Sequence, residues 1–313
     1  MVKHLVLLSP LFLLVLLFIS ITEVAEGTKK SYGVYKNNNN SIKLFVFGDS
    51  YVDTGNFLNS PSYKLPYGIT FPGKPAGRFS DGRVLTDYIA SYLKIETPTP
   101  YALRNSTTLQ YGINFAQGGT GIFQTLTNGP NMTVQIDSLE KLIQQNVYTK
   151  QELESSVALI GASGNDYTAF IVNNRSILIT VVTFHLGCVD ILNLVSENHN
   201  KELLQTVQQL NQQAGKSVYV TLDLYNAFLS TIATMKKNHE ENSTLMNPLK
   251  WCCEGEGLNN KCGSVDDNGE KKYSLCEKPE LSFFWDYVHP SQNGWNSVYT
   301  LLQPSLGQLI DNN

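Results

Sequence analysis

The sequence predicts an α/β fold, a three-layer α/β/α sandwich with a mostly parallel central sheet. Short β-prone runs alternate with segments of helical periodicity, the pattern of parallel sheets whose crossovers are helices. The first β-prone run, residues 44–47, is apolar throughout, as expected for a strand that is buried on both faces. The chain has 313 residues, of which 42% are apolar and 16% charged, so intrinsic disorder is excluded.

The elements follow one another from a first strand, Leu44-Phe45-Val46-Phe47, which ends in a turn at Gly48. A long irregular connection rich in Pro, Gly, Ser and Tyr follows over residues 57–82. Apolar residues at helical spacing predict helices over residues 84–93, 136–143, 189–210 and 223–237. Apolar runs predict further strands over residues 157–160, 177–184 and 218–222.

The crossover between two of these strands is short. If residues 157–160 and 177–184 are both parallel strands, only the 16 residues 161–176 join them. A crossover needs at least about 10 to 12 residues, which leaves room for one short helix at best. We therefore expect one helix that covers the sheet to be missing. No internal repeat or boundary divides the rest, so residues 42–311 are expected to form a single domain.

The N-terminus predicts export from the cell. Lys3 and His4 precede an apolar run over residues 5–21, and Ala25-Glu26-Gly27 is a small-x-small cleavage pattern. Residues 1–27 therefore predict a secretory signal peptide, for which a membrane anchor is the alternative. No second segment is apolar enough to span a bilayer, so we expect a secreted, extracellular protein without a stable membrane anchor after cleavage.

Secretion would permit glycosylation and disulfide formation, and the sequence has candidate residues for both. Five Asn-x-Ser/Thr sites are candidate glycosylation sites: Asn39, Asn105, Asn131, Asn174 and Asn242. Four cysteines, Cys252, Cys253, Cys262 and Cys276, share a Gly- and Asn-rich stretch that is too polar to pack alone. We expect disulfides there, with a zinc cluster as the rival, because paired C-x-x-C spacing is absent. Cys188 has no obvious partner.

The charge balance argues against a nucleic-acid partner. There are 23 basic and 27 acidic side chains, which give a formal net charge of -4. A phosphate backbone requires a strongly cationic surface, and this composition does not provide one.

Three residue clusters lie at or near the ends of predicted strands, where ligands gather in open parallel sheets. In Gly48-Asp49-Ser50, the serine would stand at the start of a following helix, as a nucleophile or simply as a helix cap. Gly118-Gly119 would expose backbone N–H groups to an anion, or would serve only a sharp turn. Asn165 would present an amide at the sheet edge, or would belong to an ordinary Asn-Asp turn.

A fourth cluster near the C-terminus has the spacing of a proton relay. Asp286 and His289 are three residues apart in Phe-Trp-Asp-x-x-His-Pro. A carboxylate at that distance can accept from the imidazole Nδ1–H while Nε2 faces outward to a serine. Asp-x-x-His also arises by chance as a surface pair.

Together the four clusters, in this order and with the Cys252-Cys253 pair, resemble the plant GDSL esterase/lipase family of the SGNH hydrolase superfamily. The resemblance covers nearly the whole chain after residue 27. It implies a flavodoxin-like sheet and a serine hydrolase of carboxylic esters, with Ser50 as nucleophile, His289 as base and Asp286 as its orienting acid. It implies an oxyanion hole of the Ser50 N–H, the Gly118 N–H and the Asn165 amide, with the adjacent Gly119 as the alternative to Gly118. It implies a small-molecule or lipid ester as substrate, and no metal or other cofactor.

The chain departs from that family in its middle. The family has a longer segment between Asp166 and Glu197, and its Pro-Leu-Gly-Cys-x-Pro motif is reduced here to the segment around Cys188. Two alternatives therefore stay open beside the esterase: an acyltransferase that uses the same site, and a noncatalytic or truncated form with a compromised scaffold. The loop aromatics Tyr63, Tyr67 and Phe71 would either line the site entrance or pin the loop to the core.

Overall fold

The computed structural model describes residues 42–173, 190–242, 247–257 and 259–311, all within one compact unit, Asn38–Asn312. Its main sheet has four strands in the order β2-β3-β1-β4, and every neighbouring pair is parallel. The strands are β1 (Leu44–Gly48), β2 (Thr99–Pro100), β3 (Gly112–Asn114) and β4 (Val157–Gly161). This confirms the mostly parallel sheet predicted from the sequence.

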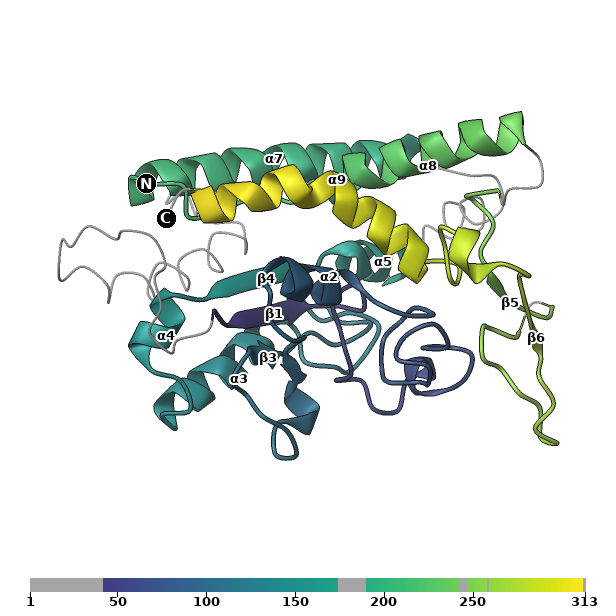
Figure 1. The fold of residues 1–313 in the computed structure, drawn as a ribbon, viewed down its shortest axis with the longest axis horizontal. Coiled ribbons are helices and arrows are strands. Elements are labelled where there is room, and N and C mark those ends of the chain that lie inside the picture. The colour runs from purple at the N-terminus through teal and green to yellow at the C-terminus, as the bar shows by residue number, and fades with distance from the viewer. Residues whose placement is uncertain (1–41, 174–189, 243–246, 258, 312–313) are drawn as a thin grey trace, which may run out of the picture. The chain divides into compact units, whose positions relative to one another are not determined.

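The central strand β1 is buried on both faces, and successive side chains alternate between them. Leu44 and Val46 join a core cluster with residues of α2 (Leu85–Tyr92), α8 (Leu224–Glu241) and α9 (Gln292–Asp311). On the opposite face, Phe45 packs edge-on against Tyr148, with ring centroids 4.9 Å apart. Figure 1 shows the sheet between α2 and α9 on one side and α3 (Met132–Gln144) on the other, which confirms the three-layer sandwich.

Most of the predicted helices are present, although their bounds differ by a few residues. The predicted helices at 84–93 and 136–143 correspond to α2 and α3, and those at 189–210 and 223–237 to α7 (Asp190–Ala214) and α8. The sequence did not predict the short strands β2 and β3. The remaining elements are α4 (Lys150–Glu154), α5 (Gly164–Asn173) and the antiparallel pair β5 (Cys253–Gly255) and β6 (Tyr273–Leu275), with short 3₁₀ turns at Pro61–Tyr63, Tyr101–Leu103 and Pro279–Leu281.

The predicted strand over residues 218–222 is wrong. The structure has no strand there, and a side chain occupies the backbone groups at its start. Asn211 Oδ1 accepts from the N–H groups of Val218 and Tyr219, each at 2.8 Å, and Asn211 Nδ2 donates to the Tyr219 carbonyl. The other predicted strand, residues 177–184, lies outside the described residues, as do the predicted signal peptide and Cys188.

Within the described part of the sheet, β4 is the strand at the outer edge next to β1. It is also less covered than β1, since Ile160 is 44% exposed whereas every residue of β1 is buried. The neighbouring helix α5 likewise leaves Phe170 66% exposed. Apolar side chains on β4 and α5 are therefore exposed. This is the region where the short crossover predicts that a covering helix is missing.

Two disulfides fasten the segment that precedes the Asp286 motif. Cys252 pairs with Cys276, and Cys253 pairs with Cys262. These bonds confirm the disulfides predicted from the sequence and exclude the zinc cluster, since the four sulfurs are consumed. The Cys252 and Cys253 N–H groups donate to the carbonyls of Phe284 and Trp285, so the disulfide segment runs alongside the chain that leads to Asp286.

Replacing Gly48 by alanine is expected to destabilise the fold by about 4 kcal/mol or more, in the range of severe core defects. Gly48 has φ +138°, and an added Cβ would lie 1.9 Å from the Gly161 carbonyl oxygen of the paired strand. Urea unfolding of both proteins measures the difference. Gly164→Ala is the matched control, because nothing lies within 4 Å of its added Cβ. Equal unfolding midpoints for the two variants would contradict the account of this turn.

Candidate functional site

Ser50 lies in the turn that follows β1 and is 8% exposed. The Asp49 N–H donates to the Gly161 carbonyl at 3.0 Å, and the Asp49 carbonyl accepts from the N–H groups of Val52 and Asp53. The helix predicted to begin at Ser50 is therefore a single turn, and that prediction is wrong. The physical reason is the Asp53 side chain, whose Oδ1 accepts from the N–H groups of Gly55 and Asn56 and ends the helical path there.

The structure brings Ser50, His289 and Asp286 together. Ser50 Oγ is 2.9 Å from His289 Nε2, across 239 residues of sequence. His289 Nδ1 is 2.8 Å from Asp286 Oδ2 and 2.9 Å from Oδ1. A carboxylate can only accept, so Nδ1 carries the proton and Nε2 is free to accept from the serine hydroxyl. This is the connectivity of a serine, histidine and aspartate triad.

The Asp286 carboxylate is buried but well supplied with donors. Its Oδ1 accepts from the N–H groups of Val288 and His289, at 3.0 and 2.9 Å. Burial acts to raise the pKa of Asp286, but the charge and hydrogen bond of His289, with the other donors, hold it below its ordinary value. Asp286 is therefore positioned to remain ionised beside the imidazole.

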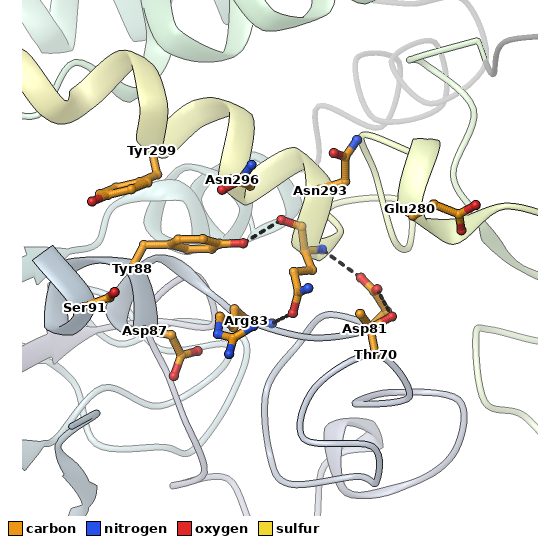
Figure 2. A pocket seen from close by; sticks show the side chains of 11 residues that line it. Thr70, Asp81, Arg83, Asp87, Tyr88, Ser91, Glu280, Asn293, Asn296 and Tyr299 are labelled. Carbon is orange, nitrogen blue, oxygen red and sulfur yellow. Dashed lines mark hydrogen bonds between the residues drawn. The ribbon is translucent and has the colours of Figure 1, made fainter.

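Contacts on the flank of the triad hold the segment that carries His289. Ser80 Oγ donates to the Pro290 carbonyl at 3.0 Å, and the Gln292 N–H donates to Asp81 Oδ1 at 2.7 Å. Figure 2 shows this region around a cavity of about 500 Å³, where the Tyr88 hydroxyl also donates to the Gln292 carbonyl. None of the residues that line this cavity belongs to the triad. Asp81 and the Arg83 N–H both bond to Gln292, so they fasten the segment after His289 to the 70–83 segment.

The Gly118 N–H was predicted as an oxyanion donor, and this is wrong in the structure. That N–H donates to Asp53 Oδ2 at 2.9 Å, so a buried carboxylate already occupies it. The next residue, Gly119, has φ +80°, and its N–H has no acceptor among the described residues. The Gly118 N–H is therefore used in a structural bond, whereas the Gly119 N–H is available to a ligand. The sequence alone does not distinguish the two glycines.

Asn165 lies at the start of α5, near the turn that carries Ser50. Its Nδ2 donates to the Thr120 carbonyl at 3.0 Å and is 3.5 Å from Asp49 Oδ2. The amide thus has one firm bond and one long contact. The long contact is weak enough for the second N–H to turn toward another acceptor.

Sequence reasoning missed two buried residues that support the nucleophile turn. Gln135 on α3 is 1% exposed, and its amide accepts from the Gly48 N–H at 2.8 Å and donates to the Gly48 carbonyl at 3.0 Å. It lies one residue before the helix predicted over residues 136–143, so that prediction did not point to it. Asp53, fully buried, joins this turn to the Gly118 loop. Its only sequence signal was the Asp-x-Gly-Asn turn composition.

The turn also holds two buried carboxyl groups with unusual proton affinity. Burial raises the pKa of Asp49 to about 7, opposed by the Tyr51 N–H and by His289, and assisted by Asp166 and Asp53. Burial likewise raises the pKa of Asp53 to about 6, despite the N–H groups that point at it. Each ionised form is therefore less favourable in the folded protein than in the unfolded chain.

Asp49→Asn is expected to stabilise the protein at pH 8 but hardly at pH 4. The pKa of Asp49 is higher in the folded protein than in the unfolded chain. Its protonated carboxyl therefore favours the folded state fully below about pH 4, and this contribution to the free energy of unfolding is lost as the pH rises to about 7. A shift of about three pKa units corresponds to about 4 kcal/mol. Unfolding of both proteins at the two pH values measures this, with the exposed Asp137→Asn as control. A gain that is equal at both pH values would contradict the prediction.

The predicted glycosylation sites differ in accessibility. Asn105 and Asn242 are exposed, whereas the Asn131 side chain caps α3 by accepting from the Val134 N–H. Asn39 and Asn174 lie outside the described residues. In the ranges that the structure describes, no helix has the length and apolarity to cross a bilayer. In those same ranges, no three His, Cys, Asp or Glu side chains are grouped to hold a metal ion.

The sequence is similar to that of known esterases and lipases. The model of the family GDSL-like Lipase/Acylhydrolase matches residues 44–179. The chain is 42% identical to GDSL esterase/lipase At5g03610 of Arabidopsis thaliana, over 93% of each chain. It is 39% identical to GDSL esterase/lipase At3g09930 of the same plant, over 95% of this chain and 98% of the relative. Acetylajmalan esterase 2 of Rauvolfia serpentina is 25% identical, over 84% and 90%.

The comparison also bears on the length of the chain. The alignment with At3g09930 has 347 positions, and since this chain has 313 residues, at least 34 of those positions have no residue here. The identity nevertheless extends over nearly the whole of both chains, far beyond the matched family model. The chain belongs to the plant GDSL esterase/lipase family, a family of carboxylic ester hydrolases.

Proposed function

We propose that this protein is a secreted serine hydrolase that cleaves carboxylic esters through an acyl-enzyme intermediate. The observation that carries the proposal is the unbroken relay from Ser50 Oγ through His289 to Asp286, with contacts of 2.9 and 2.8 Å. The substrate would be a small-molecule or lipid ester. Membership of an esterase family supports the reaction class.

In the first half-reaction, Ser50 Oγ attacks the ester carbonyl carbon while His289 Nε2 takes the hydroxyl proton. The tetrahedral intermediate then collapses, the carbon–oxygen bond to the alcohol breaks, and His289 returns the proton to the departing oxygen. In the second, water attacks the acyl group on Ser50 and gives a proton to His289. The acid leaves as Ser50 Oγ regains that proton. Asp286 holds the imidazole in the required tautomer throughout.

The negative charge on the intermediate needs donors near Ser50. We assign the Ser50 N–H and the second N–H of the Asn165 amide, which would leave its long contact with Asp49. Because the Gly118 N–H is bonded to Asp53, Gly119 replaces it in the proposal. Loss of one such donor typically lowers the rate by about 100-fold or more.

Export from the cell is part of the proposal. Residues 1–27 would be removed as a signal peptide, and residues 42–311 would act as a single domain. The two disulfides support an oxidising compartment, because such bonds rarely persist in reducing ones. The exposed Asn105 and Asn242 are the sequons best suited to carry glycans.

The test is pre-steady-state hydrolysis of a short-chain p-nitrophenyl ester by the secreted, oxidised protein. We expect a burst of p-nitrophenolate equal to the enzyme, followed by slower turnover that releases the free acid. Release of an alkyl ester when an alcohol is added would instead favour an acyltransferase. A cooperatively folded protein without any turnover would favour a noncatalytic binding or structural protein, the candidate that the missing alignment positions support.

A further inference from the structure

A tyrosine from the long irregular loop reaches the acid of the triad. The Tyr67 hydroxyl donates to Asp286 Oδ2 at 2.8 Å, across 219 residues of sequence. Tyr67 is only 4% exposed, so water does not compete for that hydrogen bond. The hydroxyl therefore binds the same carboxylate oxygen that faces His289 Nδ1.

Packing fixes the ring that carries this hydroxyl. Tyr67 meets Trp285 and Phe79 edge-on, each with ring centroids 6.3 Å apart. Trp285 is fully buried and belongs, with Tyr67, to the cluster around the two disulfides. Phe79 in turn stacks on the His289 ring, with centroids 5.0 Å apart. The same side chains thus fix the positions of the Tyr67 hydroxyl, the Asp286 carboxylate and the His289 imidazole relative to one another.

The electrostatics suit a donor that never ionises. Burial and the neighbouring Asp286 charge raise the pKa of Tyr67 well above its ordinary value, so the hydroxyl keeps its proton. The titratable groups that face the Asp286–His289 pair are Tyr67, Asp49 and Tyr51, together with the adjacent Tyr287. Of these groups, Tyr67 donates its hydroxyl to Asp286, whereas the Tyr51 hydroxyl donates to the Val288 carbonyl at 2.9 Å.

We propose that Tyr67 is a positioning residue for the triad, whose hydroxyl anchors the Asp286 carboxylate so that His289 Nε2 stays directed at Ser50. This inference rests on the proposed function and adds a fourth group to its relay. A donor on Asp286 spreads the negative charge, which weakens the hold of the carboxylate on a protonated imidazole. Removal of this donor should therefore strengthen the binding of a proton by the Asp286–His289 pair.

The test is Tyr67→Phe, which removes the hydroxyl and keeps the ring. We expect kcat to fall at least about tenfold with KM unchanged, the loss typical of a hydrogen bond to a charged group. We also expect the acid limb of kcat/KM to move to higher pH, because the Asp286–His289 pair then binds a proton more tightly. The imidazole titration of His289, followed by NMR without substrate and assigned with His289→Gln, should move in the same direction.

Tyr148→Phe is the matched control. Tyr148 is 3% exposed and donates to the Leu109 carbonyl rather than to Asp286, so neither titration nor kcat should change. If Tyr67→Phe does not fold, 3,5-difluorotyrosine introduced at position 67 keeps ring and hydroxyl and is a stronger donor. It should move both the acid limb and the imidazole titration to lower pH.

The inference is overturned if removing or strengthening this donor leaves the His289 titration where it is in the wild type. It is also overturned if kcat falls in Tyr67→Phe only in proportion to lost folded protein. Failure of the proposed function is a separate outcome, seen as absence of ester turnover in wild-type protein. The substrate-free titration still decides the role of Tyr67 in that case.

Discussion

Ser50→Ala is expected to lower kcat for ester hydrolysis by about 10⁶-fold, the scale of losing the nucleophile of a serine hydrolase. Ser50 Oγ lies 2.9 Å from His289 Nε2, and alanine leaves the imidazole without a group to deprotonate. Substrate affinity and the unfolding midpoint should change little, because the side chain is small and its Oγ makes no other hydrogen bond among the described residues. Hydrolysis of a p-nitrophenyl ester measures the loss.

Ser163→Ala is the control for this experiment. Ser163 stands in Gly-Ala-Ser-Gly, which superficially resembles a nucleophile elbow but lacks its final glycine. The structure gives no bond between Ser163 and a histidine within the described residues. Full activity is therefore expected for Ser163→Ala, and a reversal of the two results would mean that the nucleophile has been misassigned.

The second large effect is expected for Asp286→Asn, which should lower kcat by about 10⁴-fold with little change in KM. The asparagine amide would donate toward His289 Nδ1, which favours the tautomer that carries its proton on Nε2. That proton would then point at Ser50 Oγ and prevent its activation. Steady-state kinetics at the pH optimum measures the loss.

The geometry around Asp286 makes this substitution a sharp test. Val288 and His289 donate their N–H groups to Oδ1, and one acceptor oxygen of asparagine can keep those bonds. The buried Tyr67 hydroxyl, which donates to Oδ2 in the wild type, would instead accept from the second N–H of the asparagine amide. The variant should therefore still fold cooperatively. Retention of more than a tenth of the wild-type kcat would contradict the role of Asp286 as the orienting acid.

The sequence predicted the fold well wherever the signal was local. β1 and β4 follow from continuous apolar runs of four residues, and α2, α3, α7 and α8 follow from apolar residues at helical spacing. The short strands β2 and β3 have only two and three residues, too few for a periodic pattern. The strand predicted at residues 218–222 failed because Asn211, on a different element, takes its backbone donors.

The residues of the site show the same difference between local and long-range signals. Ser50, Asp286 and His289 stand in short motifs whose residue types reveal their chemistry, and the structure brings all three together. The side chains that support these three residues come from positions far away in the sequence. Tyr67 meets Asp286 over 219 residues, and Gln135 meets Gly48 over 87. Contacts of that range leave no spacing in the sequence, and the Gly118 error has the same origin, since its bond to Asp53 spans 65 residues.

Labelling with a fluorophosphonate, followed by peptide mapping, would identify the nucleophile of this protein. The reagent reacts only with a serine that its histidine has activated, so it reads the nucleophile independently of the natural substrate. We expect stoichiometric modification of Ser50, and no modification in His289→Gln. Folded protein that hydrolyses esters but carries the label elsewhere, or carries none, would contradict this assignment.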